Sequence, residues 1–171
     1  MPSRMWRLAL AAAVAAACHE GLQPTLPPTS CPKSVVGICG TVALRGVLPD
    51  STQAVYVIAY HTFPHSRDSL FTFQPPVDKL KPLPLDSAST FYLIPVDPGR
   101  YEWVVAVWVR QGFTVANADS TLREAGYYRD PADTSQPGVV NVFAQGTDSI
   151  DFVIDFEHMN PPCRYYDPPC P

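Results

Sequence analysis

The chain has 171 residues and a formal net charge of −4, and 46% of its residues are hydrophobic. This length suits one domain with a core of its own. The charge is acidic and the basic residues form no patch, which argues against nucleic acid as a partner.

The first 17 residues have the pattern of a secretory signal. Arg4 and Arg7 precede a run of small and apolar residues, 8–17, that ends in three alanines. This run is shorter than the roughly 20 residues that a membrane-spanning helix needs. We therefore expect 1–17 to be an export signal that is removed. Removal leaves ten basic and sixteen acidic residues, a net charge of −6.

The cysteine that follows these alanines resembles the lipobox of bacterial lipoproteins. The resemblance implies that Cys18 is diacylated on its sulfur, becomes the mature N-terminus and anchors the chain to a membrane. Lipoboxes more often carry Leu where this chain has Ala15, so cleavage at an ordinary A-x-A site stays open. His19 stands where Asp acts as an inner-membrane retention signal, which favours the outer membrane. We expect an exported protein of the cell envelope.

The cysteine count agrees with a lipidated Cys18. An exported chain then keeps an even number of cysteines for disulfides: Cys31, Cys39, Cys163 and Cys170. Each short segment, 31–39 and 163–170, contains proline and is able to turn back, which favours these two pairs. The competing pairing ties the N-terminal strand to the tail. The spacings C-x7-C and C-x6-C do not fit a zinc site.

Proline-rich segments flank the predicted domain at 37–158. Residues 18–36 have no periodicity and read as an extended tether between the lipid anchor and the domain. The tail, 159–171, contains two cysteines and is expected to be held by its own disulfide.

Inside the domain, short apolar runs alternate with turn residues, a pattern typical of β-strands. The expected strands are 38–46, 54–62, 69–74, 90–96, 101–110, 139–144 and 150–156. Residues 112–138 are polar and interrupted by Gly126, so they are expected to form a long loop, with room for a helical turn at 120–124.

The stretch 97–110 is predicted to be the central strand of the sheet core. Asp97-Pro98-Gly99 is a turn sequence, and the Val- and Trp-rich run after it has no polar position between residues 104 and 109. Alternation predicts two faces: Tyr101, Trp103, Val105, Val107 and Val109 on one, and Glu102, Val104, Ala106, Trp108 and Arg110 on the other.

Seven or eight short strands predict an all-β, Ig-like β-sandwich. The chain resembles the transthyretin-like (prealbumin-like), carboxypeptidase-regulatory-like sandwich domains over residues 37–157. The resemblance rests on I-C-G-T-V-A-L-R-G, A-V-Y-V-I-A-Y, F-Y-L-I-P-V-D-P-G-R-Y-E-W-V-V-A-V-W, A-G-Y-Y, V-V-N-V-F and I-D-F-V-I-D-F. Such domains are mostly non-catalytic accessory or envelope modules, which implies a binding or structural role.

No catalytic constellation, cofactor motif or metal-ligand pattern stands out. The chain has no G-x-S-x-G and no phosphate-binding glycine loop. His61, His65 and His158 are interpreted as exposed histidines rather than metal ligands. Asp151 and Asp155 on the last strand are interpreted as a solvated face. A hydrolase using those carboxylates is the least favoured hypothesis.

Aromatic residues offer an alternative function. Trp103 and Trp108 are an odd number of residues apart and project from opposite faces, so either one faces outward or both are buried. With Tyr127 and Tyr128 an outward ring could stack on sugars, which predicts a carbohydrate-binding accessory module. The other interpretation packs Gly126-Tyr127-Tyr128 over the end of the sandwich. The favoured hypothesis is a non-enzymatic envelope lipoprotein that binds envelope proteins or glycans.

Overall fold

The computed structural model describes residues 31–33, 35–147 and 149–166. The predicted signal at 1–17, the predicted lipidation site Cys18 and most of the tether lie outside these ranges. Among the described residues, eight strands form three small sheets, and helical segments are short. The fold is therefore all-β, as the sequence predicts. No helix in the described part is long and apolar enough to cross a membrane.

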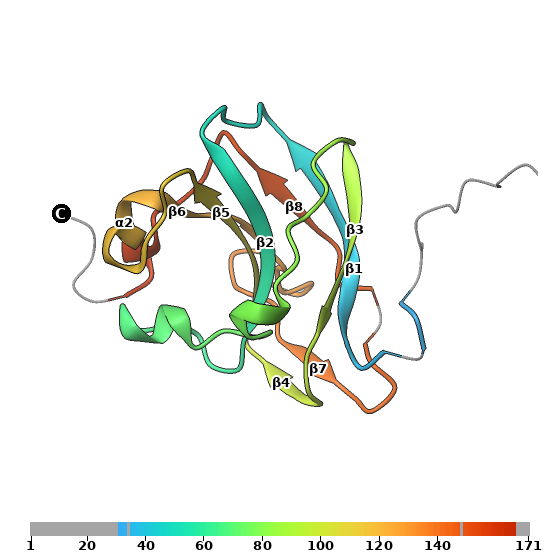
Figure 1. Cartoon of the computed structure of the whole chain (residues 1–171). Helices are drawn as coiled ribbons and strands as arrows, with labels where there is room; N and C mark the ends of the chain where they lie inside the picture. Colours follow the sequence, from blue (N-terminus) through green and yellow to red (C-terminus); the bar gives the residue numbers. More distant parts are fainter. Residues whose placement is uncertain (1–30, 34, 148, 167–171) are drawn as a thin grey trace, which may run out of the picture.

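The first sheet has the strand order β3-β1-β8. Strand β1 (Gly37–Arg45) pairs antiparallel with β3 (Ser89–Pro95) and parallel with β8 (Phe152–Asp155). Figure 1 shows β1 and β3 side by side. The first and last strands of the described domain are thus neighbours, but because they run parallel, the start of β1 and the end of β8 lie at opposite ends of the pair.

The second sheet has the order β2-β5-β6, and it carries the predicted central strand. Strand β5 (Trp103–Arg110) lies between β2 (Thr52–Tyr60) and β6 (Leu122–Tyr127), antiparallel to both. Its β-branched and aromatic residues suit a pleated surface that is covered on both faces. The prediction of a central strand here is confirmed.

The predicted turn and central strand are divided by a bend at Glu102. The residues before it form β4 (Gly99–Tyr101), which pairs with β7 (Val140–Val142) in the third sheet. Tyr101 consequently packs in the main core, whereas Trp103 packs on the other side of the second sheet. The prediction that both side chains share a face is wrong, because the bend interrupts the alternation.

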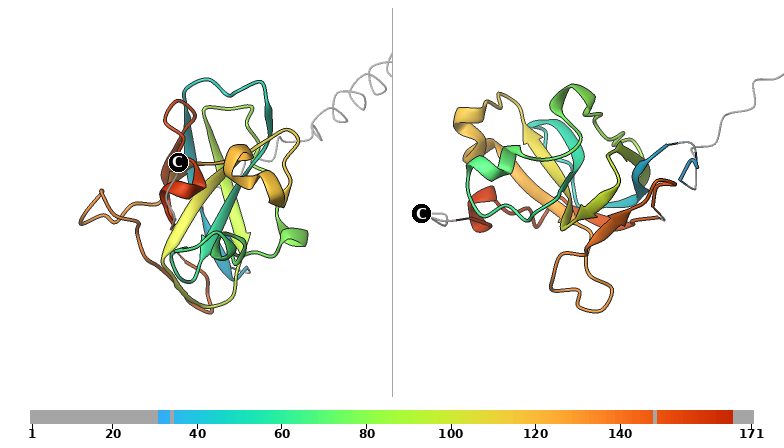
Figure 2. Two further views of the ribbon diagram at one scale, coloured as in Figure 1. Left: turned by 90° about the vertical axis from the view of Figure 1, so that its left-hand side faces the viewer. Right: turned by 90° about the horizontal axis from the view of Figure 1, so that it is seen from below.

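The main core lies between the inner faces of the first two sheets. Buried side chains come from β1, β3 and β8 on one side and from β2, β5 and β6 on the other. Figure 2 shows the sheets in two further views, with the segment after β6 projecting from the body. The core includes Ile38, Val42, Val55, Val57, Tyr92, Ile94, Val104, Ala106, Trp108, Ala125, Phe152 and Ile154.

The predicted strand at 69–74 is wrong. Asp68–Phe71 forms a 3-10 helix, η1, and a second one, η2, follows at Val77–Lys79. Only Gln74 pairs with a strand, through a bridge to Ala59. The prolines around this segment remove ladder donors. The chain therefore meets the edge strand β2 at this single bridge, and η1 and η2 pack over the outer face of the second sheet.

The predicted loop at 112–138 contains strand β6, which the sequence analysis missed. The segment begins with a 3-10 helix, η3 (Val115–Asn117), and a single helical turn, α2 (Ala118–Thr121). Gly126, interpreted as a breaker, lies within β6 at φ +154°, where a Cβ atom would lie 2.0 Å from the Val153 carbonyl oxygen. Glycine here allows β6 to approach β8 closely.

Cys31 and Cys39 form a disulfide with their Cα atoms 5.7 Å apart, as predicted. Cys163 is also disulfide-bonded, and its predicted partner Cys170 lies outside the described residues. Part of the tail packs on the domain: residues 160–166 include a 3-10 helix, η4 (Pro162–Arg164), and Asn160 forms a backbone bridge with Glu124 of β6.

Candidate functional site

The second sheet is apolar on both faces. The inner face, with Val104, Ala106 and Trp108, closes the main core. The outer face belongs to a second cluster with Trp103 and Val105. A sheet with one solvated face would carry polar residues at these outer positions, so the outer face requires a cover of its own.

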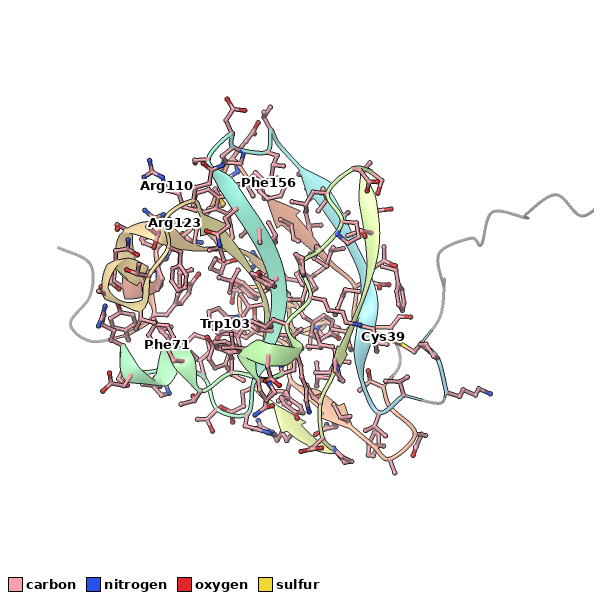
Figure 3. All side chains as sticks on the ribbon, in the orientation of Figure 1. Cys39, Phe71, Trp103, Arg110, Arg123 and Phe156 are labelled. Atoms are coloured by element: carbon pink, nitrogen blue, oxygen red, sulfur yellow. A yellow bond between two sulfur atoms is a disulfide. The ribbon has the colours of Figure 1, made fainter. Side chains whose placement is uncertain are left out.

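Four short helical segments supply that cover, and they come from distant parts of the chain. Leu70 and Phe71 of η1, Val77 of η2, Val115 of η3 and Pro162 of η4 all line the same space over the sheet. In Figure 3, Phe71 lies on the left and Cys39 of β1 on the right, with Trp103 between them.

The cover leaves an apolar pocket of about 370 Å³ on the outer face, which we call the sheet pocket. Its floor includes Tyr56 and Ile58 of β2 and Val105 and Val107 of β5. Pockets of this size and apolar lining are typical of small-molecule sites. The complete lining is Gln53, Tyr56, Ile58, Tyr60, Leu70, Phe71, Phe73, Val77, Leu80, Trp103, Val105, Val107, Val109, Phe113, Val115, Leu122, Arg123, Glu124, Pro162 and Tyr165.

Three large apolar side chains of the pocket lining are exposed. Val77 is 73% exposed, Val115 is 58% exposed and Phe71 is 36% exposed. Apolar side chains that line a pocket and also face water mark its rim, where an apolar ligand would remove them from solvent.

Aromatic rings surround Trp103, and two of them, Tyr60 and Tyr165, also line the sheet pocket. The ring centroid of Trp103 lies 4.8 Å from that of Phe63, 5.1 Å from Tyr165, 5.5 Å from Tyr60 and 6.3 Å from Tyr127. These distances are in the range of favourable aromatic pairs. The rings stabilise the position of Trp103, which is 3% exposed.

Trp103 carries the one buried side-chain polar atom that has no hydrogen-bond partner among the described residues, its Nε1. A buried N–H without an acceptor costs free energy, and buried indole groups usually have a partner. Trp108, the other tryptophan of the described part, donates its Nε1–H to Thr52 Oγ1 at 2.7 Å. The unsatisfied donor is therefore specific to the tryptophan that lines the pocket.

Glu124 places a carboxylate in this otherwise apolar wall. It faces outward from β6 beside Val107 and is only 6% exposed. Asn160 Nδ2 and the Tyr165 hydroxyl each donate to its Oε2 at 2.7 Å. Burial, followed by the negative charge of Glu124, raises the pKa of Tyr165 well above its usual value, so Tyr165 remains a proton donor.

Glu124 and Tyr127 both face outward because β6 contains a β-bulge. They are an odd number of residues apart, so a regular strand would direct them to opposite faces. The β5–β6 register shifts between Ala106 and Val107, and one extra residue of β6 is accommodated there. Such bulges re-aim side chains and are common beside functional sites.

A second, more polar cavity of about 850 Å³ lies beside the sheet pocket. The two cavities share Trp103, Glu124 and Tyr165 in their lining. The polar cavity also contains Arg129, whose guanidinium carbon lies 4.5 Å from the centre of the Tyr127 ring. The wall that holds Trp103 and Glu124 therefore separates an apolar space from a polar one.

The structure does not bring the three candidate histidines together. His61 stacks on Tyr101 with ring centroids 4.2 Å apart, and His65 lies near Phe63. His158 instead meets Asp155 and Glu157, with ligand-type atoms within 4.8 Å of one another. The hydrogen bond from His158 lowers the pKa of Asp155, and these groups lie at the surface.

The predicted aromatic ligand-binding residues do not form an exposed platform. Trp108 is 5% exposed and belongs to the main core, and Trp103 is buried too. Both tryptophans are thus buried, which was one of the two expected outcomes. Tyr127 and Tyr128 are partly buried and pack on opposite sides of the second sheet.

Comparison of the chain with protein-family models, with curated proteins and with solved structures finds no match.

Sequence reasoning found Trp103 but missed the other main residues of the site. Glu124 falls in the segment interpreted as a loop, and Asn160 falls in the segment interpreted as a tail. The sequence did contain a signal: Leu122 and Glu124 are two residues apart, as side chains on one face of a strand are. It predicts a short strand if Gly126 is accepted as a strand residue rather than a breaker.

Proposed function

We propose that this protein is a non-enzymatic lipoprotein of the cell envelope whose β-domain binds a small apolar ligand in the sheet pocket. The observation that carries the binding role is the pocket itself. It is an apolar cavity on a sheet face that neither the main core nor another sheet covers.

The anchoring part of the proposal rests on the sequence. The basic start, the short apolar run and Cys18 support export and lipidation, and the proline-rich segment that follows supports a spacer between membrane and domain. The outer membrane is favoured over the inner one, because His19 follows the cysteine.

We also propose that the first two sheets form a transthyretin-like sandwich. Their inner faces share one core, and β4 and β7 extend the arrangement at one end. In this interpretation the sheet pocket lies on the outside of the sandwich, where the residues of a binding site can differ without disturbing the main core.

The test is the binding of N-phenyl-1-naphthylamine, a neutral apolar dye that fluoresces in apolar surroundings. We expect saturable binding to the wild-type chain. The double variant Val77→Asp/Val115→Asp places two carboxylates at the rim. It should bind the dye about fivefold more weakly, because dye binding would remove these carboxylates from water. Both side chains are exposed, so the fold should persist.

The matched control is Val47→Asp. Val47 is 80% exposed and does not line the sheet pocket, so this change adds a carboxylate without altering the site. Equal dye affinity in the wild type and in the rim variant, or the absence of saturable dye binding, would show that the sheet pocket does not bind apolar ligands.

A further inference from the structure

Glu124 is the feature of the sheet pocket that an apolar ligand alone does not explain. Its side chain lies on the outer face, opposite Val107 in the β5–β6 register, at the junction of the apolar and polar cavities. Carboxylates are rarely this deeply buried unless they are paired, because burial removes them from water.

The carboxylate is held in a fixed position. Both of its hydrogen bonds, from Asn160 and from Tyr165, end on Oε2. The backbones of Glu124 and Asn160 also exchange two hydrogen bonds of 2.8 Å. No group among the described residues donates to Oε1, so one oxygen of a positioned carboxylate remains available to a donor from outside the protein.

No cation of the described chain forms an ion pair with Glu124. The ion pairs are those of Arg67 with Asp119, Arg100 with Glu102 and His158 with Asp155. The two hydrogen bonds to Glu124 use part of the carboxylate's acceptor capacity, but neither donor carries a positive charge that would balance it.

Three arginines that line a cavity together with Glu124 donate to other groups. Arg123 lines the sheet pocket, but its guanidinium donates to the backbone oxygens of Asp119 and Leu122. Arg129 donates to the Tyr127 hydroxyl and to the Thr134 backbone oxygen. Arg164 donates to the Asn160 side-chain oxygen and reaches Glu124 only through that amide.

Aromatic rings surround the same carboxylate. Tyr165 contacts Glu124 directly, and its ring lies 5.1 Å from that of Trp103. A carboxylate beside aromatic side chains suits a protonated amine, because ring faces attract cations and the carboxylate accepts the N–H.

We propose that the ligand of the sheet pocket is an amphiphilic amine. Its hydrocarbon part lies on the apolar floor formed by Tyr56, Ile58, Val105 and Val107. Its ammonium group donates to Glu124 Oε1 next to the Tyr165 ring. This assignment rests on the proposed apolar-ligand function and names the head group that this pocket selects.

The experiment compares octylamine, octanol and octanoate, which share one hydrocarbon chain and differ in head-group charge. Each compound is titrated into the purified full chain at neutral pH and the heat of binding is measured. The blank is the same titration into buffer without protein. We expect octylamine to bind about tenfold more tightly than octanol, the strength of a charge-assisted hydrogen bond. Octanoate should bind more weakly still, because its negative carboxylate is repelled by the negative carboxylate of Glu124.

The variant Glu124→Gln keeps the shape of the side chain and removes its charge. It should reduce the preference for octylamine over octanol to within about twofold. The control Glu157→Gln removes an exposed carboxylate outside the sheet pocket and should leave the preference unchanged. Thermal unfolding of each variant checks that the fold is retained.

The wild-type series tests the proposal without any variant. Octanoate binding as tightly as octylamine, no binding of octylamine, or an unchanged preference in Glu124→Gln would each overturn it. If octylamine fails while the neutral dye still binds saturably, the pocket keeps its proposed function and only the amine assignment is wrong. If the dye fails as well, the pocket itself is not a ligand site.

Discussion

At the scale of single residues, the two tryptophans of β5 show how one strand serves two environments. Trp108 lies in the main core with its indole N–H bonded to Thr52, whereas Trp103 lies in the outer cluster with its N–H unsatisfied. Both are almost fully buried. Burial alone therefore does not distinguish them, and the difference lies in the hydrogen bond.

This difference predicts unequal effects of the same substitution. Trp108→Phe should lower the free energy of unfolding by about 1 kcal/mol more than Trp103→Phe, because only the former loses a hydrogen bond. Urea denaturation of both variants measures this. The two changes remove the same atoms from buried positions, so each is the control for the other. Equal losses would contradict the assignment of the hydrogen bond.

At the scale of elements, β6 decides whether the pocket exists. It pairs with β5, contributes Leu122 and Glu124 to the lining, and approaches β8 at Gly126. Without β6, β5 would be an edge strand, and no carboxylate would stand in the outer wall.

Gly126→Ala should therefore destabilise the protein strongly. The added Cβ would lie 2.0 Å from the Val153 carbonyl oxygen, and φ is +154°. We expect a loss of roughly 3 kcal/mol or more in the free energy of unfolding, together with weaker dye binding as β6 is displaced. Urea denaturation and the dye titration measure the two effects.

Gly112→Ala is the control for this change. Gly112 also has a positive φ, +80°, but an added Cβ would meet no atom within 4 Å. Its cost should be limited to the left-handed backbone, about 1 kcal/mol. Similar losses at both positions would show that backbone strain, rather than the contact between β6 and β8, makes Gly126 necessary.

The elements predicted best are those whose signal is local. The runs that form β1, β2, β3 and β5 are apolar and β-branched, and their lengths suit strands. The predictions for 69–74 and 112–138 fail because the first segment crosses a sheet face and the second contains a bulged strand with glycine inside it. Both outcomes depend on neighbours distant in sequence.

At the scale of the whole molecule, the proposed lipid anchor determines where the pocket is presented. We expect the wild-type chain in the membrane fraction, with the mass of residues 18–171 plus lipid. Cys18→Ser should move it to the soluble fraction, because it loses the acyl chains. Fractionation and intact-mass measurement check this. Cys39→Ser, which breaks the disulfide with Cys31 but leaves Cys18, is the control and should stay membrane-bound.

By itself, the sequence determined the all-β class and the central strand over 103–110 with its tryptophans on opposite faces, and it favoured the Cys31–Cys39 pair. These features follow from patterns over a few residues, because successive side chains of a strand point to opposite faces and cysteines close in sequence can pair. Only the tertiary structure decided the site. A bulge directs Glu124 outward, and four short helical segments far apart in sequence meet over one sheet face. Long-range packing selects these arrangements, because the local pattern is equally compatible with others.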